Sequence, residues 1–422
     1  MIALICTGAI SYANSPSEDQ PCKENSSEES QSEEGLSEEG LASETSVPLV
    51  QLQGDAEQRA AELIGQDTTL LATDRAALLA AIDHSLNYLR TPGSVNAYRN
   101  YAVAGITHNR VRRSLQRFRT LVSTSHSVAE LQRAITTEFD FYQAAGQDGV
   151  GTVAFTGYFE PTYQASFTPD ETYRYPIYKR PLALDQWSQP HPTRADLEGT
   201  DGLQAQQGPL KELELVWLPT RLEAFLIQVQ GSARLEMTDG NTFSVGYDGR
   251  TEYPYTSIGR ALIDDGIIPA EALTLPVLMG YFEQNPAALD SYIPRNDRFV
   301  FFRATNGAPA TGSLGYPVTA GRSIATDKAL MPPGALALIN LPFPQANGGS
   351  AGQTNEGVGE ADLLENSSAS ELTSRLVLDQ DTGGAIKGAG RVDLFVGTGS
   401  EAGEVAGLIN SEGSLYYLLL KD

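Results

Sequence analysis

The sequence LDQDTGGAIKGAGRVDLFVG, residues 378–397, holds the densest set of candidate catalytic carboxylates and is the most informative stretch about the fold. Apolar runs at 376–378 and 392–396 flank a glycine-rich segment that can adopt positive φ and turn sharply, which predicts two strands joined by a tight turn. Asp381 therefore lies at the end of the first strand, and Asp393 lies on the second. Gly383 and Gly384 belong to the turn between them.

Side chains on the second strand alternate between two faces. Val392, Leu394 and Val396 share one face, and Arg391, Asp393 and Phe395 share the other. An aromatic neighbour favours the raised pKa that a general acid needs, whereas Arg391 favours the ionised form. The pattern alone leaves Asp393 open to two interpretations, a solvated strand or turn carboxylate and a catalytic acid.

A third aspartate, Asp327, precedes Met331-Pro332-Pro333-Gly334. Asp and Pro-Pro-Gly are ordinary turn residues, so the pattern predicts a structural role for Asp327.

Working outward, residues 151–422 contain many short runs rich in Val, Ile, Tyr and Phe between Gly and Pro turns, which predicts barrels of short strands. The expected strands are 153–158, 213–218, 224–229, 299–303, 336–341, 376–378, 392–396 and 415–420. Helices are expected at 257–265 and 275–283. Residues 67–146 have helical periodicity, with Ser127 as an N-cap of the third helix.

Two acidic segments interrupt this pattern. Residues 15–47 hold ten acids and one lysine and include SEEGL twice, at 32–36 and 37–41. Residues 345–371 hold five acids and no base. Both lack the apolar residues that offset the entropy of ordering, so we expect a disordered linker at 15–66 and a flexible insertion at 345–371. Residues 1–14 resemble the end of a secretion signal, although the basic n-region is missing.

Composition excludes several classes of function. The net charge of -24 argues against nucleic-acid binding, which relies on Lys and Arg. The two cysteines, Cys6 and Cys22, rule out a disulfide framework in the folded part, and the four histidines show no metal-ligand spacing. No apolar run reaches the length of a spanning helix. We expect no metal and no organic cofactor.

Several motifs together resemble a known family. Asp327 with its Pro-Pro-Gly turn, Asp381 in DTGGAIKG and Asp393 in VDLF resemble the three-aspartate "3D" domain. Upstream, the motifs follow the order of the membrane-bound lytic murein transglycosylase A (MltA) family: FTGYFEP at 155–161, YPIY at 175–178, FLIQVQGS at 225–232, YTSIGRALI at 255–263 and EQNP at 283–286. The resemblance extends from about residue 70 to the C-terminus.

The resemblance implies a mainly β fold with an N-terminal helical segment. The expected units are a helical region leading into the first barrel strand (67–161), an inserted β domain (162–298) and a double-psi β-barrel (299–422). The glycan would lie between the two β domains. Gln228, Gln230 and Ser232 fit this groove as sugar-binding groups at alternate strand positions, with cross-strand hydrogen bonding or solvent exposure as the alternative. Tyr158 fits a stacking role or a core role. Glu160 departs from the threonine of some members.

The resemblance also implies an activity. Family members cleave the β-1,4 bond between N-acetylmuramic acid and N-acetylglucosamine in peptidoglycan and leave a 1,6-anhydro ring. The C6 hydroxyl of muramic acid is the nucleophile, so one aspartate can serve as acid and then as base, whereas ordinary glycosidases need two carboxylates. This role falls to Asp393, a supporting role to Asp381, and a structural role to Asp327, Gly383 and Gly384.

Three alternatives stay open: a non-catalytic peptidoglycan-binding barrel, a hydrolysing muramidase with Asp381 as second carboxylate, and a purely structural or scaffold protein. The expected partner is the glycan strand of peptidoglycan, with a membrane tether as an option. The expected location is the cell envelope, in the periplasm or at the outer membrane.

Overall fold

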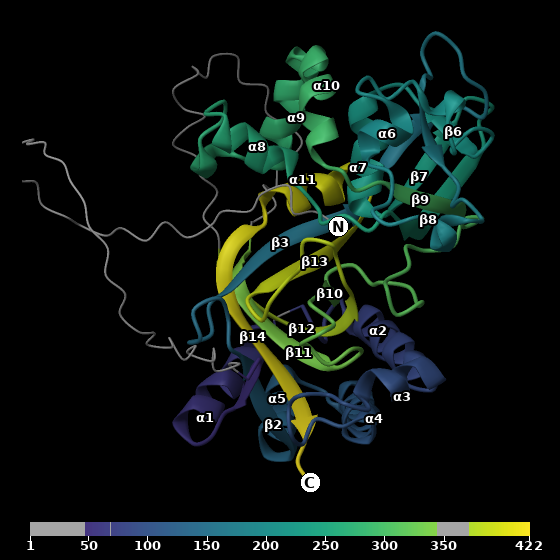
Figure 1. The fold of residues 1–422 in the computed structure, drawn as a ribbon. Helices are drawn as coiled ribbons and strands as arrows, with labels where there is room; N and C mark the ends of the chain where they lie inside the picture. Colours follow the sequence, from purple (N-terminus) through teal and green to yellow (C-terminus); the bar gives the residue numbers. More distant parts are fainter. Residues whose placement is uncertain (1–46, 68, 344–370) are drawn as a thin grey trace, which may run out of the picture.

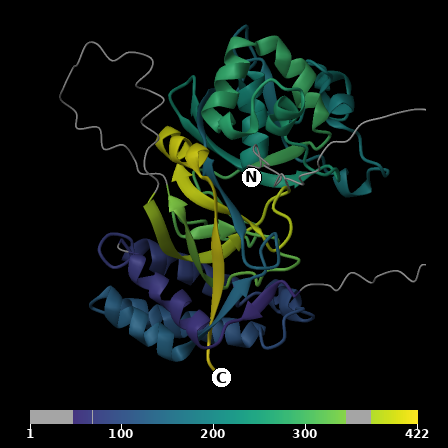
Figure 2. The same ribbon diagram turned by 90° about the vertical axis from the view of Figure 1, so that its left-hand side faces the viewer.

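The computed structural model describes residues 47–67, 69–343 and 371–422. The signal-like residues 1–14, the acidic segment up to residue 46 and the insertion up to residue 370 lie outside the described residues. The described chain is strand-rich with several helices, and it forms three layers: helices at one end, a barrel in the middle and a second domain at the other end (Figure 1, Figure 2).

The barrel is a closed ring of six strands. Strand order β14-β11-β12-β10-β13-β3 is completed by pairing of β3 with β14. Within this ring, β3 pairs with β13 in parallel and β10 pairs with β12 in parallel. The other pairings of neighbouring strands are antiparallel. The strands are β3 (Val153–Glu160), β10 (Ser323–Ala325), β11 (Leu336–Phe343), β12 (Glu371–Asp381), β13 (Arg391–Thr398) and β14 (Asn410–Leu420).

The helical layer packs against the barrel and adds two strands to its sheet. Strand β14 pairs with β3 through residues 410–413 and with β2 through residues 416–420. The two neighbours therefore hydrogen-bond to successive parts of the same edge of β14. The elements are β1 (Leu49–Gln51), α1 (Asp55–Glu62), η1 (Leu63–Gln66), α2 (Arg75–Tyr88), α3 (Pro92–Tyr98), α4 (His108–Thr124), α5 (Val128–Glu138) and β2 (Phe139–Ala144).

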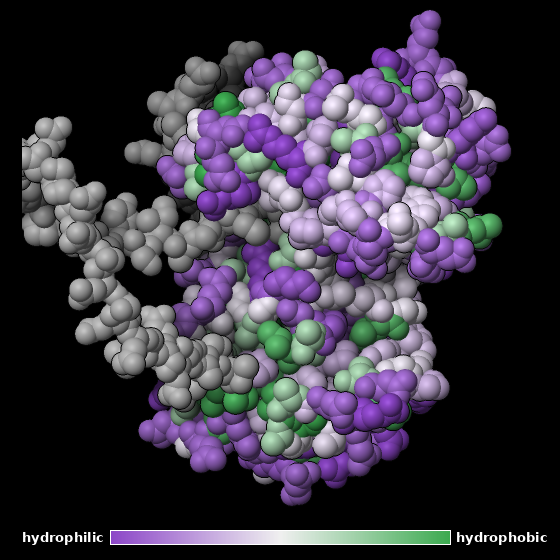
Figure 3. Space-filling view, viewed as in Figure 1, coloured by the Kyte–Doolittle hydropathy of each residue, from purple (hydrophilic) through white to green (hydrophobic). Residues whose placement is uncertain are grey.

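The second domain is mixed α/β. Its sheet has the order β4-β7-β8-β9, and β5 and β6 form a separate two-stranded antiparallel sheet. In the view of Figure 3 its surface is mostly hydrophilic. Its strands are β4 (Thr162–Ala165), β5 (Tyr175–Tyr178), β6 (Glu214–Leu218), β7 (Ser232–Met237), β8 (Thr242–Arg250) and β9 (Val300–Ala304). Its helices are η2 (Leu184–Gln186), α6 (Arg194–Glu198), η3 (Ala205–Gln207), α7 (Arg221–Gln230), α8 (Ile258–Asp264), η4 (Ala270–Ala272), α9 (Leu275–Gln284), η5 (Pro286–Ala288), α10 (Leu289–Tyr292) and η6 (Ile293–Arg295). Helix α11 (Ser400–Leu408) follows β13 and packs on the barrel beside α9.

The structure confirms most predicted elements and corrects four. Residues 48–66, assigned to the linker, form β1, α1 and η1, and residues 139–144, assigned to the helical region, form β2. The predicted strand 224–229 is part of helix α7. The second domain is not purely β, and it extends past residue 298, because β9 pairs with β8.

The error at α7 has a clear physical cause. Thr220 and Glu223 form a capping box, in which each side chain accepts the other residue's backbone N–H, and Gly231 ends the helix in the left-handed conformation with φ 82°. These end signals outweigh the strand propensity of Phe225, Ile227 and Val229.

A buried ion pair links the helical layer to the barrel. The Arg322 guanidinium, fully buried before β10, donates to both carboxylate oxygens of Asp67, at 2.6 and 3.1 Å, and to Asp74 Oδ2 at 3.0 Å. Asp67 also accepts the backbone N–H of Leu376 on β12 at 3.1 Å. The contacts of Arg322 with Asp67 and Asp74 span 255 and 248 positions of the sequence, and that of Asp67 with Leu376 spans 309.

Arg322→Gln removes the cation that two carboxylates share and leaves Asp67 buried without its counter-charge. We expect a loss of about 3–5 kcal/mol in the free energy of unfolding, measured by urea denaturation. Arg119→Gln is the matched control, because Arg119 pairs with Asp83 on the surface, where such pairs contribute about 0–1 kcal/mol. Equal losses in the two variants would contradict this account.

Candidate active site

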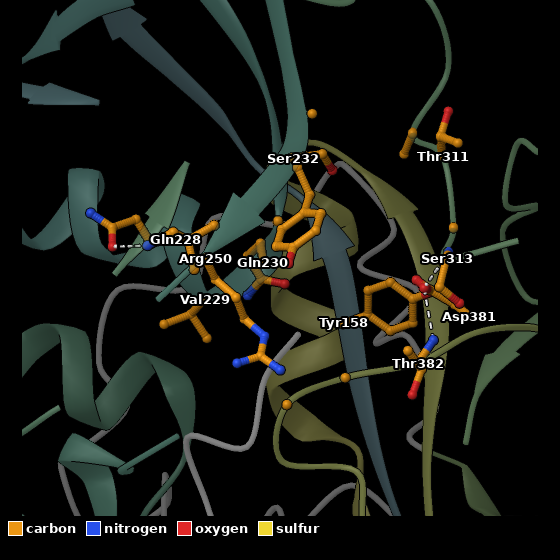
Figure 4. A pocket seen from close by; sticks show the side chains of 18 of the residues that line it. Tyr158, Gln228, Val229, Gln230, Ser232, Arg250, Thr311, Ser313, Asp381 and Thr382 are labelled. Carbon is orange, nitrogen blue, oxygen red and sulfur yellow. Dashed lines mark hydrogen bonds between the residues drawn. The ribbon is translucent and has the colours of Figure 1, made fainter. Parts of the chain in front are cut away.

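A cleft of about 580 Å³ lies between the barrel and the second domain. Its second-domain wall includes Gln228, Gln230, Ser232 and Arg250. The barrel wall includes Tyr158, Ser313, Asp381 and Thr382, and Figure 4 shows the two walls facing each other. The predicted groove between the two domains is therefore present.

Asp381 lies on the barrel wall of the cleft with both carboxylate oxygens engaged. Oδ2 accepts the Tyr158 hydroxyl at 2.9 Å. Oδ1 accepts the backbone N–H groups of Ser313 and Thr382, each at 2.8 Å (Figure 4). Burial raises the pKa of Asp381, and these hydrogen bonds oppose the rise because they favour the ionised form.

Asp393 lies behind the cleft wall and is fully buried. Its Oδ1 accepts a hydrogen bond from the Thr156 hydroxyl and lies 3.3 Å from Arg391 Nη2. Its Oδ2 has no hydrogen-bond partner. Burial raises the pKa of Asp393, while Arg391 and the bond from Thr156 hold it down, so desolvation outweighs the positive charge.

The strand register brings Asp381 and Asp393 to neighbouring positions. Ala325 on β10 pairs with Asp381 on one side and with Asp393 on the other. The two aspartates are thus about two strand spacings apart, roughly 10 Å between their backbones. Each carboxylate disfavours ionisation of a close neighbour, and Asp381 contributes to the raised pKa of Asp393.

The predicted alternation of faces on β13 holds from Val392 to Phe395 but not at Val396, where the register with β3 shifts and the side chain packs against both clusters. Val392 and Leu394 belong to the barrel core, whereas Phe395 packs in a separate cluster with Tyr158 and the helices of the second domain. The Tyr158 and Phe395 rings are 5.2 Å apart. Tyr158 is a buried residue that also lines the cleft, so both of its expected roles are compatible with its place.

Gln228, Gln230 and Ser232 line the cleft, but they do not occupy alternate positions of one strand. The two glutamines are on α7, and Ser232 begins β7. Gln228 Oε1 accepts hydrogen bonds from Arg194 Nη2 at 2.8 Å and from the backbone N–H of Val300 at 3.3 Å. Gln230 Oε1 accepts the N–H of Phe159 at 3.3 Å, and its buried Nε2 has no partner, so Gln230 retains a free donor at the cleft.

Asp327 joins two barrel turns. Its Oδ1 accepts the N–H of Ala329 at 3.2 Å, and its Oδ2 accepts the N–H of Gly388 at 3.0 Å. Both contacts are to backbone, which is the arrangement expected of a turn-forming residue.

The glycine turn after Asp381 forms part of the cleft and contacts the second domain. A Cβ at position 384 would lie 1.5 Å from Arg298 Nη1, so only glycine allows this approach. Gly383 and Gly384 both line the cleft. Across the part of the chain that the structure describes, no group of His, Cys, Asp and Glu side chains is placed to hold a metal ion.

Comparisons with known proteins agree with this architecture. The profile of the MltA specific insert domain matches residues 154–303, and that of the 3D domain matches residues 322–419. The membrane-bound lytic murein transglycosylase A of Escherichia coli K12 is 32% identical over 282 residues, covering 66% of this chain and 69% of the relative. The chain belongs to the MltA family.

Solved structures of MltA family proteins share the fold. The membrane-bound lytic murein transglycosylase from Agrobacterium tumefaciens has a TM-score of 0.66 at 25% identity, covering 88% of this chain and 97% of that one. Escherichia coli MltA with bound chitohexaose has a TM-score of 0.63 at 26% identity, covering 89% and 96%. The family resemblance seen in the motifs is confirmed.

Some features of the site in this MltA family chain could not be found from the motifs. Thr156 belongs to the quoted motif FTGYFEP, but the motif does not reveal its hydrogen bond to Asp393, 237 positions away. Arg250 and Arg298 line the cleft outside the quoted motifs. No helix of the described residues has the length and apolar character needed to cross a membrane.

Because the pKa of Asp393 is raised in the folded chain, the free energy of unfolding should depend on pH through this residue. Above the ordinary aspartate pKa of about 3.9, the folded chain keeps a proton that the unfolded chain has lost, so this contribution to stability falls as pH rises through the folded pKa. Asp393→Asn lacks this contribution. We expect the stability of the variant relative to wild type to increase from pH 4 upward, measured by urea unfolding at several pH values.

Asp239→Asn is the opposite control. The N–H of Asn241 lowers the pKa of this exposed aspartate, so its contribution is lost as pH falls, and the difference between variant and wild type should change in the other direction. A pH-independent difference for Asp393→Asn would contradict the raised pKa.

Proposed function

We propose that this chain is a lytic transglycosylase that cleaves the β-1,4 bond between N-acetylmuramic acid and N-acetylglucosamine in peptidoglycan and leaves a 1,6-anhydromuramic end. The main observation that supports this proposal is the place of Asp393. Its buried carboxyl group, with a raised pKa, lies on a barrel strand behind the cleft between the two domains. The family supports the substrate, since its relatives are named murein transglycosylases and one solved member holds chitohexaose.

The hydrogen bonds support different roles for the two aspartates. Both oxygens of Asp381 accept hydrogen bonds, which favours a carboxylate that stabilises positive charge on the sugar ring. Asp393 Oδ2 accepts none, so it is free to hold a proton and to donate it. We therefore assign acid and base catalysis to Asp393 and electrostatic support to Asp381.

A single residue, Asp393, can both donate and accept the proton that this reaction transfers. Asp393 donates its proton to the glycosidic oxygen as the C1–O bond breaks, and N-acetylglucosamine leaves with a hydroxyl. The C6 hydroxyl of muramic acid then bonds to C1 and loses its proton to the Asp393 carboxylate. The residue returns to its protonated state, and no water is consumed, so the paired carboxylates of ordinary glycosidases are not required.

The proposal requires that the glycan reaches a carboxyl that is buried in the free protein. The Tyr158 and Phe395 rings lie on the same side of the barrel as Asp393, toward the second domain. We propose that sugar binding displaces this cover and brings the glycosidic oxygen within hydrogen-bond distance of Oδ2.

Two further assignments accompany this function. We assign the six-stranded ring with its two parallel pairs, β3–β13 and β10–β12, to the double-psi class of barrel. We place the chain in the cell envelope, where peptidoglycan lies, in line with the names of its membrane-bound relatives.

Hydrolysis is the second candidate function. Inverting glycosidases hold their carboxyl groups about 6.5–9.5 Å apart, and the register of Asp381 and Asp393 approaches that range. A water-consuming reaction would then use Asp381 as base.

The test is to incubate the purified chain with peptidoglycan sacculi and to determine the masses of the released muropeptides. We expect products lighter by one water than hydrolysis products. Asp393→Asn should lower the rate by at least about 10²–10⁴-fold, because it removes the transferable proton. Asp381→Asn should lower it less, by about tenfold, which is ~1.4 kcal/mol of transition-state stabilisation.

Each alternative has its own outcome. Products that contain the extra water would establish hydrolysis. A wild-type chain that binds the sacculi but releases no muropeptides from them would indicate a peptidoglycan-binding protein. An active Asp393→Asn variant would move the catalytic role away from this residue.

A further inference from the structure

The cleft contains positive charge that the chain does not neutralise, although the whole chain has a net charge of -24. The charged lining residues of the cleft are two acids and five cations: Glu160, Asp381, Arg194, Arg250, Arg298, Arg303 and Lys387. Arg194 pairs with Glu198, and Glu160 pairs with Arg234. Arg303 has Asp248 at 3.9 Å, and Lys387 has Asp327 at 3.9 Å. Among the described residues, neither Arg250 nor Arg298 has a carboxylate within 4.0 Å of its guanidinium. Two cations without a counter-charge therefore lie on the second-domain side of the cleft.

Backbone contacts hold these two arginines in place. Arg298 Nε donates to the Tyr253 carbonyl at 2.7 Å, and its Nη1 lies against Gly384 of the barrel turn. Arg250, the last residue of β8, donates from Nη1 to the Thr251 carbonyl at 3.1 Å. Figure 4 shows the Arg250 side chain extending into the cleft. A carbonyl oxygen orients a guanidinium but supplies no negative charge.

The arrangement is electrostatically unfavourable in the empty cleft. Burial and the neighbouring Arg250 lower the pKa of Arg298 to about 10, so Arg298 remains a cation at neutral pH. Like charges that are held together in a partly desolvated site gain most from an anionic ligand. Guanidinium groups favour carboxylates, which they bind through two parallel hydrogen bonds.

We propose that Arg250 and Arg298 bind a carboxylate of the substituent on muramic acid while the glycan lies in the cleft. The inference rests on the proposed function and specifies its substrate class. The sugar rings and their N-acetyl groups are neutral, so the carboxylates of murein are found on the lactyl group and on the stem peptide attached to it. The cleft thus selects a carboxylate-bearing glycan over a neutral chitin-type chain.

The experiment measures binding, so that it does not depend on turnover. Isothermal titration calorimetry is carried out on the full chain bearing Asp393→Asn, with three probes. The first is a peptide-bearing murein oligomer, the second is the same oligomer after amidase removal of the peptide, which frees the lactyl carboxylate, and the third is neutral chitohexaose. The first two probes distinguish a stem-peptide carboxylate from the lactyl carboxylate.

We expect Arg298→Gln and Arg250→Gln each to weaken binding of at least one carboxylate-bearing probe by about tenfold and to change chitohexaose binding by less than about twofold. Arg298→Lys should restore part of the affinity. High salt should reduce the difference between probes, because it screens the charge. Arg119→Gln, which removes an equal charge far from the cleft, should have no effect on any probe.

Arg250→Gln keeps the test valid if Arg298→Gln fails to fold, since the Arg298 side chain packs against the barrel. Equal losses for charged and neutral probes, or no loss for either, would overturn the inference and leave the proposed function intact. A wild-type chain that releases no muropeptides from sacculi and binds none of the probes would overturn the proposed function and this inference with it.

Discussion

The parallel pairing of β3 with β13 is the constraint on which the rest of the molecule depends. It joins residues 154–160 to residues 391–398, and together with the β3–β14 pairing it closes the barrel. The same register sets Thr156 opposite Asp393 and Tyr158 opposite Phe395. Because β3 then leads directly into β4 of the second domain, the strand that closes the barrel also places the cleft over the candidate acid. At this exit Glu160 accepts hydrogen bonds from Arg234 of the second domain and Thr398 of the barrel, each at 2.8 Å.

Three buried aspartates lie on β12 and β13, the strands on either side of β10, and the same burial has different consequences for each. Burial raises the pKa of Asp379, Asp381 and Asp393. Asp379 is satisfied by Lys328, by Thr326 and by the Tyr417 hydroxyl at 2.7 Å, as a structural carboxylate should be. Asp393 keeps one oxygen without a partner. A buried polar atom left unpaired costs stability, and such costs are commonly retained where they serve function.

The local pattern predicted the faces of β13 from Val392 to Phe395, the N-cap of α5 at Ser127 and the Asp381 strand end, because these depend on neighbours in sequence. It fails at α7, where the apolar composition favours a strand although the sequence also contains the capping box and the terminal glycine of a helix. It also fails at residues 48–66, whose order depends on β1 pairing with β2. The partner of Asp393 and the arginines of the cleft depend on register between segments far apart in sequence, which composition and periodicity do not encode.

The proposed mechanism requires that the fold keeps a proton on Asp393 at a pH where a free aspartate has lost it. The direct test is a carbon-13 NMR titration of the chain with labelled aspartate side chains, with the Asp393 signal assigned by its loss in Asp393→Asn. The account predicts a pKa clearly above the ordinary value of about 3.9. A pKa at or below that value would show that Arg391 and Thr156 outweigh burial, and it would contradict the role of Asp393 as proton donor.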